Sequence, residues 1–504
     1  MPRKLKKALK IASLVITAAA MVFVGGVLMT GNQAEAQLPE YLGSQACLGC
    51  HTEKYEVWEG SGHAHMVDQI VKPSDLPADP ASAPAELKAE LDKAAYVVAG
   101  HRFLARDPAT GELKYLSVQY DDASKSYVAY KGGSSWDNGC AGCHSTGWNV
   151  ETKRNAEMGI GCEACHGPGR EHILGKGDVS KITVNAASVA CGQCHNGTGK
   201  VASGTTWPVG YRPNMMSLSE VGFTYATVTD DKVPEYGKPK MRQFAMWEAS
   251  AHANATNLLI ARGDHYLERQ ECIKCHSTSA GLMIADGQTF DPKKHLVNDG
   301  VSCVACHDPH NSTNPGQLRM EPQALCLSCH SVARGGEPVA QIGTVRAPHS
   351  PQGDMLQGIS AIGVAPTKGP HSELSCIECH MTEGNHLMKV IEPADVIGTA
   401  RKDSCSSCHT NSTPESRDIY LSLWQDSVNA RIAAVKADVT YIDAIVKARP
   451  DALGADKAAY ENARANYWYV EKDKSGGAHN FEYAIKVISS AQKEISRIKA
   501  SLSK

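Results

Sequence analysis

The sequence predicts a mainly α-helical protein with long loops, few short strands and an antiparallel helical bundle at its carboxyl end. Two observations lead to this prediction. Only 6% of the 504 residues are aromatic, whereas 18 are cysteine and 21 are histidine, so aromatic side chains alone do not fill the interior. After residue 410, apolar side chains recur at helical spacing. An ordinary charged fraction of 21% and a net charge of −3 argue against disorder.

All eighteen cysteines belong to one motif, Cys-x-x-Cys-His, which occurs nine times. This motif attaches c-type haem: both thiols form thioether bonds to the haem edge, and the adjacent histidine binds the iron. Zinc sites pair two half-motifs and a redox dithiol occurs once, so nine copies argue against both alternatives. We therefore predict nine covalently attached c-type haems. The attachment residues are Cys47, Cys50 and His51; Cys140, Cys143 and His144; Cys162, Cys165 and His166; Cys191, Cys194 and His195; Cys272, Cys275 and His276; Cys303, Cys306 and His307; Cys326, Cys329 and His330; Cys376, Cys379 and His380; and Cys405, Cys408 and His409.

The twelve histidines outside the motifs are the candidate sixth ligands. Two imidazoles close an iron to substrates and leave an electron carrier, whereas an iron with one imidazole can bind a substrate. For any single histidine, a surface position or a bond to a haem propionate is the alternative. The predicted distal ligands are His63, His101, His172, His252, His310, His349, His371, His386 and His479, and weaker candidates are His65, His265 and His295.

A short segment recurs together with the motifs that follow it. Residues 58–64 and 247–253 both read Trp-Glu-x-Ser-x-His-Ala. Each copy is followed by Cys-x-x-Cys-His-Ser-Thr, then by Gly-x-x-Cys-x-Ala-Cys-His-x-Pro, then by a third motif. Recurrence of order and local sequence favours a duplicated module over chance resemblance among haem-binding turns. We expect His63 and His252 to play the same role, as sixth ligands to haems attached elsewhere in the sequence.

Residues 1–36 have the pattern of a secretory signal peptide. Five Lys and Arg residues precede an apolar run over 11–29, and Ala34-Glu35-Ala36 has the form of a cleavage site. An uncleaved membrane anchor is the alternative. We predict cleavage and a periplasmic or extracellular protein with no later membrane span.

The segments between and after the motifs predict the remaining architecture. Residues 96–131 alternate in polarity and predict two or three short strands. Residues 331–370 are rich in Gly and Pro and predict a long loop that wraps the haems and delivers His349 and His371. Three helices are predicted, from Thr413-Pro414 to Val446, over 455–474 and over 480–502. Their apolar stripe forms either a monomer core or a subunit interface, and we expect a homo-oligomer.

Two stretches of the chain resemble known multihaem families. Cys140-Ala-Gly-Cys-His-Ser-Thr-Gly-Trp-Asn149, with the motif at Cys162 and His172, resembles the tetrahaem cytochrome c554 family over about residues 41–200. The remainder, with Ser475-Gly-Gly-Ala-His-Asn480, resembles the superfamily of pentahaem nitrite reductase, octahaem hydroxylamine oxidoreductase and tetrathionate reductase, as a nonahaem member. The resemblance implies oligomerisation through the C-terminal helices and haem ligation by His479. It divides the chain into a signal peptide (1–36), a c554-like tetrahaem domain (37–215), a pentahaem domain (216–410) and a helical bundle (411–504).

The resemblance also indicates a candidate catalytic site at His144. In c554-like proteins the haem of this motif can lack a sixth ligand, and nitrite reductases use the corresponding haem for catalysis. Nitrite reductases have a lysine in place of the motif histidine, which here is His144. They also have a catalytic histidine where this chain has Met241 and Arg242. These departures argue against a dedicated nitrite reductase.

Two functions follow from the sequence. The first is an exported nonahaem c-type cytochrome that carries electrons along stacked haems between redox partner proteins in anaerobic or extracellular respiration. The alternative is an oxidoreductase with an open, five-coordinate haem at His144 or its repeat counterpart His276, which reduces nitrite, hydroxylamine, tetrathionate or extracellular metal. Arg102 and Arg106 either bind an anion there or pair with propionates. The 54 acidic residues outnumber the 51 basic ones, which argues against a nucleic-acid partner.

Overall fold

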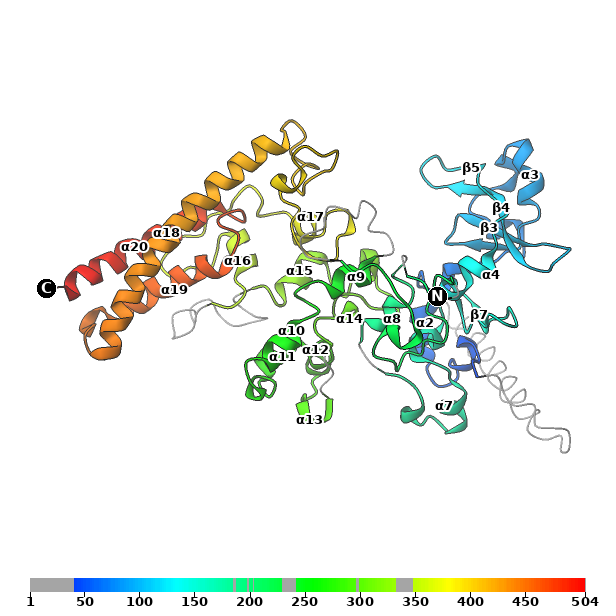
Figure 1. The fold of residues 1–504 in the computed structure, drawn as a ribbon, viewed down its shortest axis with the longest axis horizontal. Helices are drawn as coiled ribbons and strands as arrows, with labels where there is room; N and C mark the ends of the chain where they lie inside the picture. The colour runs from blue at the N-terminus through cyan, green and yellow to red at the C-terminus, as the bar shows by residue number, and fades with distance from the viewer. Residues whose placement is uncertain are drawn as a thin grey trace, which may run out of the picture. The chain divides into compact units, whose positions relative to one another are not determined.

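The computed structural model describes residues 40–503 apart from 185–186, 197–198, 203, 229–241, 296–298 and 332–347. The predicted signal peptide, Met241 and much of the predicted loop 331–370 lie outside the described residues. Contacts divide the chain into two compact units (Figure 1). The first contains the chain up to Ala226 together with Asp308–Ser312, and the second contains Thr227–His307 and Thr313–Lys504. The four-part division expected from the sequence stays a prediction.

The first unit combines short helices with an antiparallel sheet. Its sheet has the order β1-β2-β3-β4-β5, and a separate pair joins β6 to β7. The strands are β1 (Val67–Gln69), β2 (Tyr96–Val98), β3 (Arg102–Arg106), β4 (Leu113–Asp121), β5 (Ser126–Ala129), β6 (Ser145–Thr146) and β7 (Glu157–Met158). The helices are α2 (Thr52–Glu59), α3 (Ala85–Leu91), α4 (Trp136–Gly139), α5 (Ala141–His144), α6 (Cys162–His166), α7 (Arg170–Leu174) and α8 (Val189–Gly192).

The alternating stretch 96–131 forms the strands that its pattern predicts, with one break. Ala99 and Gly100 both have positive φ, 50° and 75°, and the amide of His101 donates to the carbonyl of Val98. These residues form a tight three-residue hairpin loop, because β2 and β3 pair Val98 with Arg102. The predicted first strand is therefore split into β2 and β3. The short edge strand β1, which pairs Val67 with Val98, was not predicted.

The two faces of the sheet pack against different parts of the unit. One face contributes Val97, Phe103 and Val118 to a cluster that includes Leu91 of α3. The other face contributes Leu104 and Tyr115 to a cluster with Trp136 of α4 and Ala141 of α5. Since α4 and α5 carry the second Cys-x-x-Cys-His motif, the sheet forms part of the environment of that motif.

The second unit consists of helices and loops and has no named strand among its described residues, in line with the mainly helical prediction. Its helices are α9 (Gln243–Glu248), α10 (Ala255–Ile260), α11 (Gln270–His276), α12 (Thr278–Ala285), α13 (Pro292–His295), α14 (Cys303–Cys306), α15 (Pro322–Leu327), α16 (Gln352–Gln357), α17 (Cys376–His380), α18 (Pro414–Ala448), α19 (Lys457–Asp473) and α20 (Phe481–Leu502).

The last three helices form the predicted C-terminal bundle, in which α18 and α19 both pack along α20 (Figure 1). Thr413 caps α18 by accepting a hydrogen bond from the amide of Ser416, and Pro414 occupies its first turn. The apolar stripes are buried within the chain, through Val428, Val435, Val439 and Ile442 of α18 and Tyr483, Val487, Ile488, Ala491, Ile495 and Ile498 of α20. The stripe is therefore a core of this chain, and the expected homo-oligomer stays a prediction.

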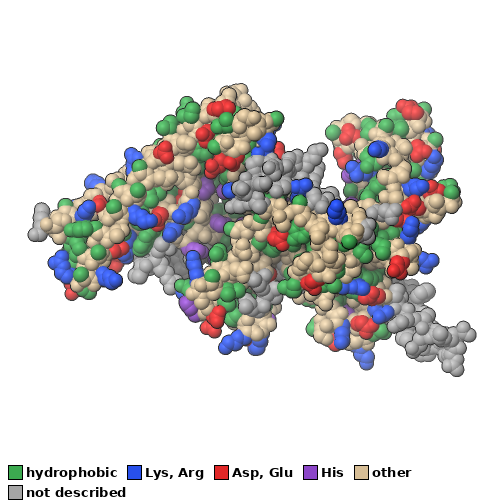
Figure 2. All heavy atoms as spheres, viewed as in Figure 1, with side chains coloured by type: hydrophobic (Ala, Val, Ile, Leu, Met, Phe, Trp, Pro, Cys, Tyr) green, Lys and Arg blue, Asp and Glu red, His purple; other side chains and the backbone are tan. Residues whose placement is uncertain are grey.

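The outer surface of the bundle is mixed in charge. Figure 2 shows Lys and Arg side chains interspersed with Asp and Glu over these helices. None of the helices in the described ranges has the length and apolarity that a membrane span requires.

The two copies of the repeated segment make the same hydrogen bonds. The indole of Trp58 donates to the carbonyl of Ile160 at 2.9 Å, and that of Trp247 donates to Val301 at 2.7 Å. The amides of Ile160 and Val301 each donate to the histidine carbonyl of their own repeat, at 2.9 Å. Duplication therefore extends from the sequence to the local geometry.

Each repeat has a glycine at a corresponding position where a larger side chain would not fit. Gly300 has φ +58°, and a Cβ there would lie 2.4 Å from the carbonyl oxygen of Ala253. Gly159 has φ +82°, with the corresponding contact to Ala64 at 2.6 Å. We expect Gly300→Ala to lower the free energy of unfolding by about 1–3 kcal/mol, because left-handed backbone and steric overlap add. Urea unfolding measures this. Gly62→Ala, where a Cβ has no neighbour within 4 Å, is the control and should change stability little.

Candidate haem-binding sites

Each Cys-x-x-Cys-His motif occupies a single turn of the backbone. The histidine amide donates to the carbonyl of the first cysteine at 3.0 Å for His51, 3.1 Å for His144 and 2.9 Å for His307. Residues i, i+3 and i+4 of a helical turn share one face. Two thiols and one imidazole can therefore approach the same group from one short peptide segment.

Eight motif histidines each lie opposite one histidine from outside the motifs. The ring centroids of every pair are 6.0–6.4 Å apart. No motif histidine is used twice, and neither is any partner. The pairs are His51 with His172, His166 with His310, His195 with His63, His276 with His349, His307 with His386, His330 with His252, His380 with His479 and His409 with His371.

The separation of these rings tests whether a haem iron fits between them. Metal–imidazole bonds of about 2 Å place the centres of two opposed imidazoles about 6 Å apart, since each bonded nitrogen lies at the ring edge. The observed separations agree with this value. Burial also lowers the pKa of several of these rings, including His63, His330 and His386, which favours the neutral form that binds metal. The residues therefore fit the group that the motifs predict.

His144 is the motif histidine without an imidazole opposite it among the described residues. The aromatic ring that packs against His144 is that of Trp136, with ring centroids 5.6 Å apart. Its Nδ1 is buried and has no hydrogen-bond partner in the described part of the chain. Burial and, secondarily, the charge of Arg102 lower the pKa of His144. This site therefore has an environment unlike that of the other eight.

The inserted sheet explains why the two repeats differ here. Arg102 of β3 lies 5.0 Å above the ring of Tyr130, and its Nε is buried without a hydrogen-bond partner in the described ranges. In the second repeat, where no sheet is inserted, the imidazole of His349 faces His276 with centroids 6.0 Å apart. His276 also has a Nδ1 contact with the carbonyl of Ala255 at 3.0 Å. The expectation that His276 marks a second open site is not supported by this geometry.

Four candidate histidines lie in none of the eight pairs. His101, predicted as a distal ligand, lies in the β2–β3 region, where its Nδ1 is 2.7 Å from the carbonyl oxygen of Ala99. The weaker candidates contact other residues: His65 pairs with Asp68, His265 with Tyr266 and His295 with Phe290. The hairpin turn at Ala99-Gly100, which the sequence pattern did not reveal, fixes the local contact of His101.

Motif thiols from different haem-attachment segments lie next to each other within each unit. In the first unit Cys47 is within hydrogen-bonding reach of Cys162, and Cys143 of Cys194. In the second unit the corresponding neighbours are Cys275 with Cys329 and Cys326 with Cys376. Pairs of predicted attachment segments therefore lie side by side within each unit.

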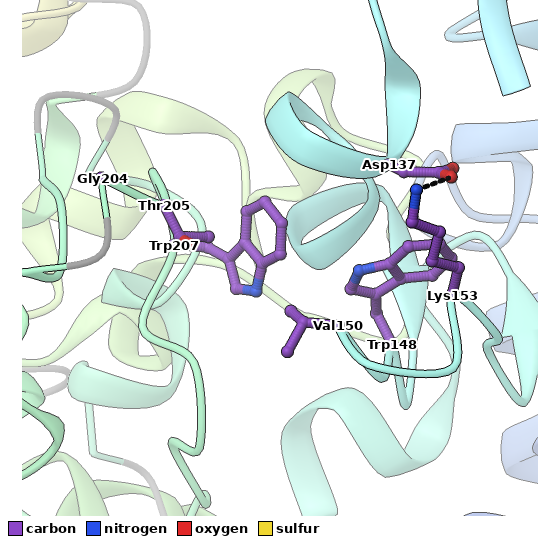
Figure 3. Close-up of a pocket in the computed structure, with 7 residues that line it drawn as sticks. All are labelled: Asp137, Trp148, Val150, Lys153, Gly204, Thr205 and Trp207. Atoms are coloured by element: carbon purple, nitrogen blue, oxygen red, sulfur yellow. Dashed lines mark ion pairs between the residues drawn. The ribbon is translucent and has the colours of Figure 1, made fainter. Parts of the chain in front are cut away.

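A pocket lies behind the second motif (Figure 3). The indole of Trp207 packs so closely on Gly142 that a Cβ there would lie 2.2 Å from the ring. On the other side, Lys153 forms an ion pair with Asp137 at 3.9 Å. Burial raises the pKa of Asp137 despite this ion pair. Trp207 therefore packs directly against the turn that carries Cys140, Cys143 and His144.

These sites define a multihaem c-type cytochrome, and comparisons with known proteins agree. The family model for cytochrome c554 and c-prime matches residues 110–167 and 237–308, which lie in the two repeats. The cytochrome c552 model matches residues 367–504, and that for a doubled CXXCH motif matches residues 295–335. Cytochrome c-554 of Nitrosomonas europaea is 24% identical over 162 residues, which cover 31% of this chain and 50% of that protein.

The solved structure of the outer cell wall cytochrome OcwA is similar over most of the chain. The TM-score is 0.77 with 26% identity, covering 91% of this chain and all of that one. An undecahaem cytochrome from the S-layer of Carboxydothermus ferrireducens has a TM-score of 0.62 with 21% identity, covering 91% and 69%. Haem of this class supplies a reversible one-electron carrier, so electron transfer is the chemistry of this chain.

Proposed function

We propose that this protein is an exported nonahaem c-type cytochrome that carries electrons between redox partners at or outside the cell surface. The observation that carries the proposal is the one-to-one pairing of eight motif histidines with eight others. Iron held between two imidazoles has no open position, which suits electron transfer rather than substrate binding. The predicted distal ligands are thus His63, His172, His252, His310, His349, His371, His386 and His479.

Two further observations support the proposal. Neighbouring motif thiols within each unit support haems that lie close together, which suits transfer between them. The predicted signal peptide and the similarity to cell wall and S-layer cytochromes support a location outside the cytoplasm.

The ligand assignment predicts a change of spin state in single variants. His252→Ala removes the imidazole opposite His330, so one low-spin iron should become high-spin in the electron paramagnetic resonance spectrum. His265→Ala is the matched control, because His265 contacts Tyr266 and lies in none of the pairs. Intact mass should show nine haems in both variants. Fewer than nine haems in the unmodified protein, or an unchanged spectrum for His252→Ala, would contradict the assignment.

A second function is favoured by the environment of His144. We propose that the haem attached there is open and reduces a small nitrogen or sulfur compound, with nitrite, hydroxylamine and tetrathionate as candidate substrates and extracellular metal as the other acceptor. The absence of a facing imidazole among the described residues supports an open position. The half-buried guanidinium of Arg102, whose Nε has no hydrogen-bond partner in the described ranges, supports an anionic substrate. Electrons from the eight paired sites would then serve this one.

A further inference from the structure

The second ring nitrogen of the paired imidazoles has a different partner at different sites. At most sites the partner is a backbone carbonyl, as for His166 with Thr183 at 2.8 Å and His307 with Gly316 at 2.7 Å. His479 differs, because its Nδ1 lies 2.6 Å from Oδ1 of Asp473. A carboxylate is a far stronger acceptor than a neutral carbonyl, so the imidazole of His479 is more electron-rich than the imidazoles bonded to a carbonyl.

The carboxylate of Asp473 is fixed in place and shielded from water. Its side chain is 2% exposed and that of His479 is 20% exposed. Asp473 also accepts hydrogen bonds from the amide and the hydroxyl of Ser475. Asp473 is the last residue of α19, and the Ser475–His479 turn returns the imidazole to it. Donation from Nδ1 leaves Nε2 of His479 available for the iron.

A second carboxylate contact in the chain provides a weaker comparison. Nδ1 of His310 lies 3.4 Å from Oδ1 of Asp308, and the two side chains are 34% and 30% exposed. The longer distance and the contact with water weaken this interaction relative to that of Asp473. We therefore expect Asp473 to interact with its imidazole more strongly than Asp308 does.

We propose that Asp473 is a positioning residue that makes the reduction potential of the iron held by His380 and His479 more negative than a carbonyl partner of His479 would. The inference rests on the proposed ligation by these two histidines. A hydrogen-bonded carboxylate increases electron donation by the imidazole, and its buried charge favours the more positive ferric iron over the ferrous one. The one electron of this step comes from the reductant used in the titration, and no bond forms or breaks.

The motif at Cys376 lies next to two other motifs of its unit. Cys376 of the same motif is within hydrogen-bonding reach of Cys326, and Cys379 interacts with Cys408 of the last motif. Asp473 thus sets the potential at the junction between the motif at Cys326 and the motif at Cys405. It thereby controls how readily the last site exchanges electrons with the rest of its unit.

The test is a potentiometric titration of the full holoprotein followed by electron paramagnetic resonance. Asp473→Asn keeps the side-chain shape but removes the charge. We expect one of the one-electron steps to move positive by at least tenfold in its equilibrium constant, about 59 mV, with haem content and the other steps unchanged. Asp308→Asn should move a different step by less. Asp443→Asn, in the same bundle but away from any paired histidine, should move none.

Further variants separate this inference from the assignment on which it rests. If His479→Ala adds no high-spin iron to those of the unmodified protein, the proposed ligation is wrong. If that variant adds one high-spin iron but Asp473→Asn moves no potential, ligation stands and the role of Asp473 is overturned. Should Asp473→Asn fail to accumulate, Ser475→Ala is the second variant. It removes the hydroxyl that competes with His479 for the carboxylate of Asp473 and keeps the Ser475 amide bond. The same step should then move negative, and no movement overturns the inference.

Discussion

His144→Ala is expected to abolish reduction of nitrite or hydroxylamine by the reduced protein while leaving electron transfer to large metal chelates nearly unchanged. Among the described residues no second imidazole faces His144, whereas under the proposed ligation the eight paired sites have no open position. The loss should exceed the roughly 10–100-fold that removal of an outer-shell partner of a metal ligand costs. Stopped-flow reoxidation of the reduced protein measures both rates. The unmodified oxidised protein should also show one high-spin iron.

Arg102→Gln separates anion binding from simple access to that site. The guanidinium lies close enough to lower the pKa of His144, and its Nε is buried without a partner in the described ranges. Reduction of anionic nitrite should therefore slow, whereas reduction of neutral hydroxylamine should not.

His276→Ala, in the other repeat, is the control for His144→Ala and should produce a new high-spin iron. Unchanged rates in His144→Ala, with nine low-spin irons in the unmodified protein, would end the open-site hypothesis.

Arg417→Met is expected to destabilise the last motif and the start of α18 by about 3–5 kcal/mol, because it leaves a buried carboxylate without its partner. Arg417 and Asp403 form an ion pair whose side chains are 10% and 0% exposed. Arg417 also donates to the carbonyl of His409 at 3.2 Å, and Asp403 accepts from the amide of Cys405 at 2.8 Å. The midpoint of urea unfolding measures the loss. Arg464→Met, at a more exposed pair with Asp443, should cost about 1 kcal/mol or less.

The effect of Arg417 should depend on pH in a defined direction. Burial raises the pKa of Asp403, but hydrogen bonds from Arg417 and the Cys405 amide outweigh it and hold the pKa below its ordinary value. A carboxyl with a lowered folded-state pKa stabilises the protein above its unfolded pKa and loses that contribution as pH falls through the folded one. The difference between Arg417→Met and the unmodified protein should therefore be largest at neutral pH and shrink in acid. A difference that grows in acid would contradict this role.

Features that depend on a few neighbouring residues could be predicted from the sequence. Each attachment site needs only Cys, Cys and His within one turn, so all nine follow from the spacing. The ends of α18, α19 and α20 follow from caps and apolar periodicity, and the structure places them within a few residues of prediction. The repeat pointed to His63 and His252, and the structure brings both to the third motif of their own repeat.

Tertiary structure decided which imidazole lies opposite which motif, and that none of the described imidazoles lies opposite His144. His310 faces His166 although 143 residues separate them in the chain, and no local pattern encodes such a contact. His101 and His310 are equally good distal-ligand candidates in the sequence. The turn after β2 brings His101 to the carbonyl of Ala99, whereas Asp308–Ser312 pack in the first unit and bring His310 to His166. Covalent attachment is a local property of the chain, whereas the sixth ligand and the surroundings of His144 depend on packing between distant segments.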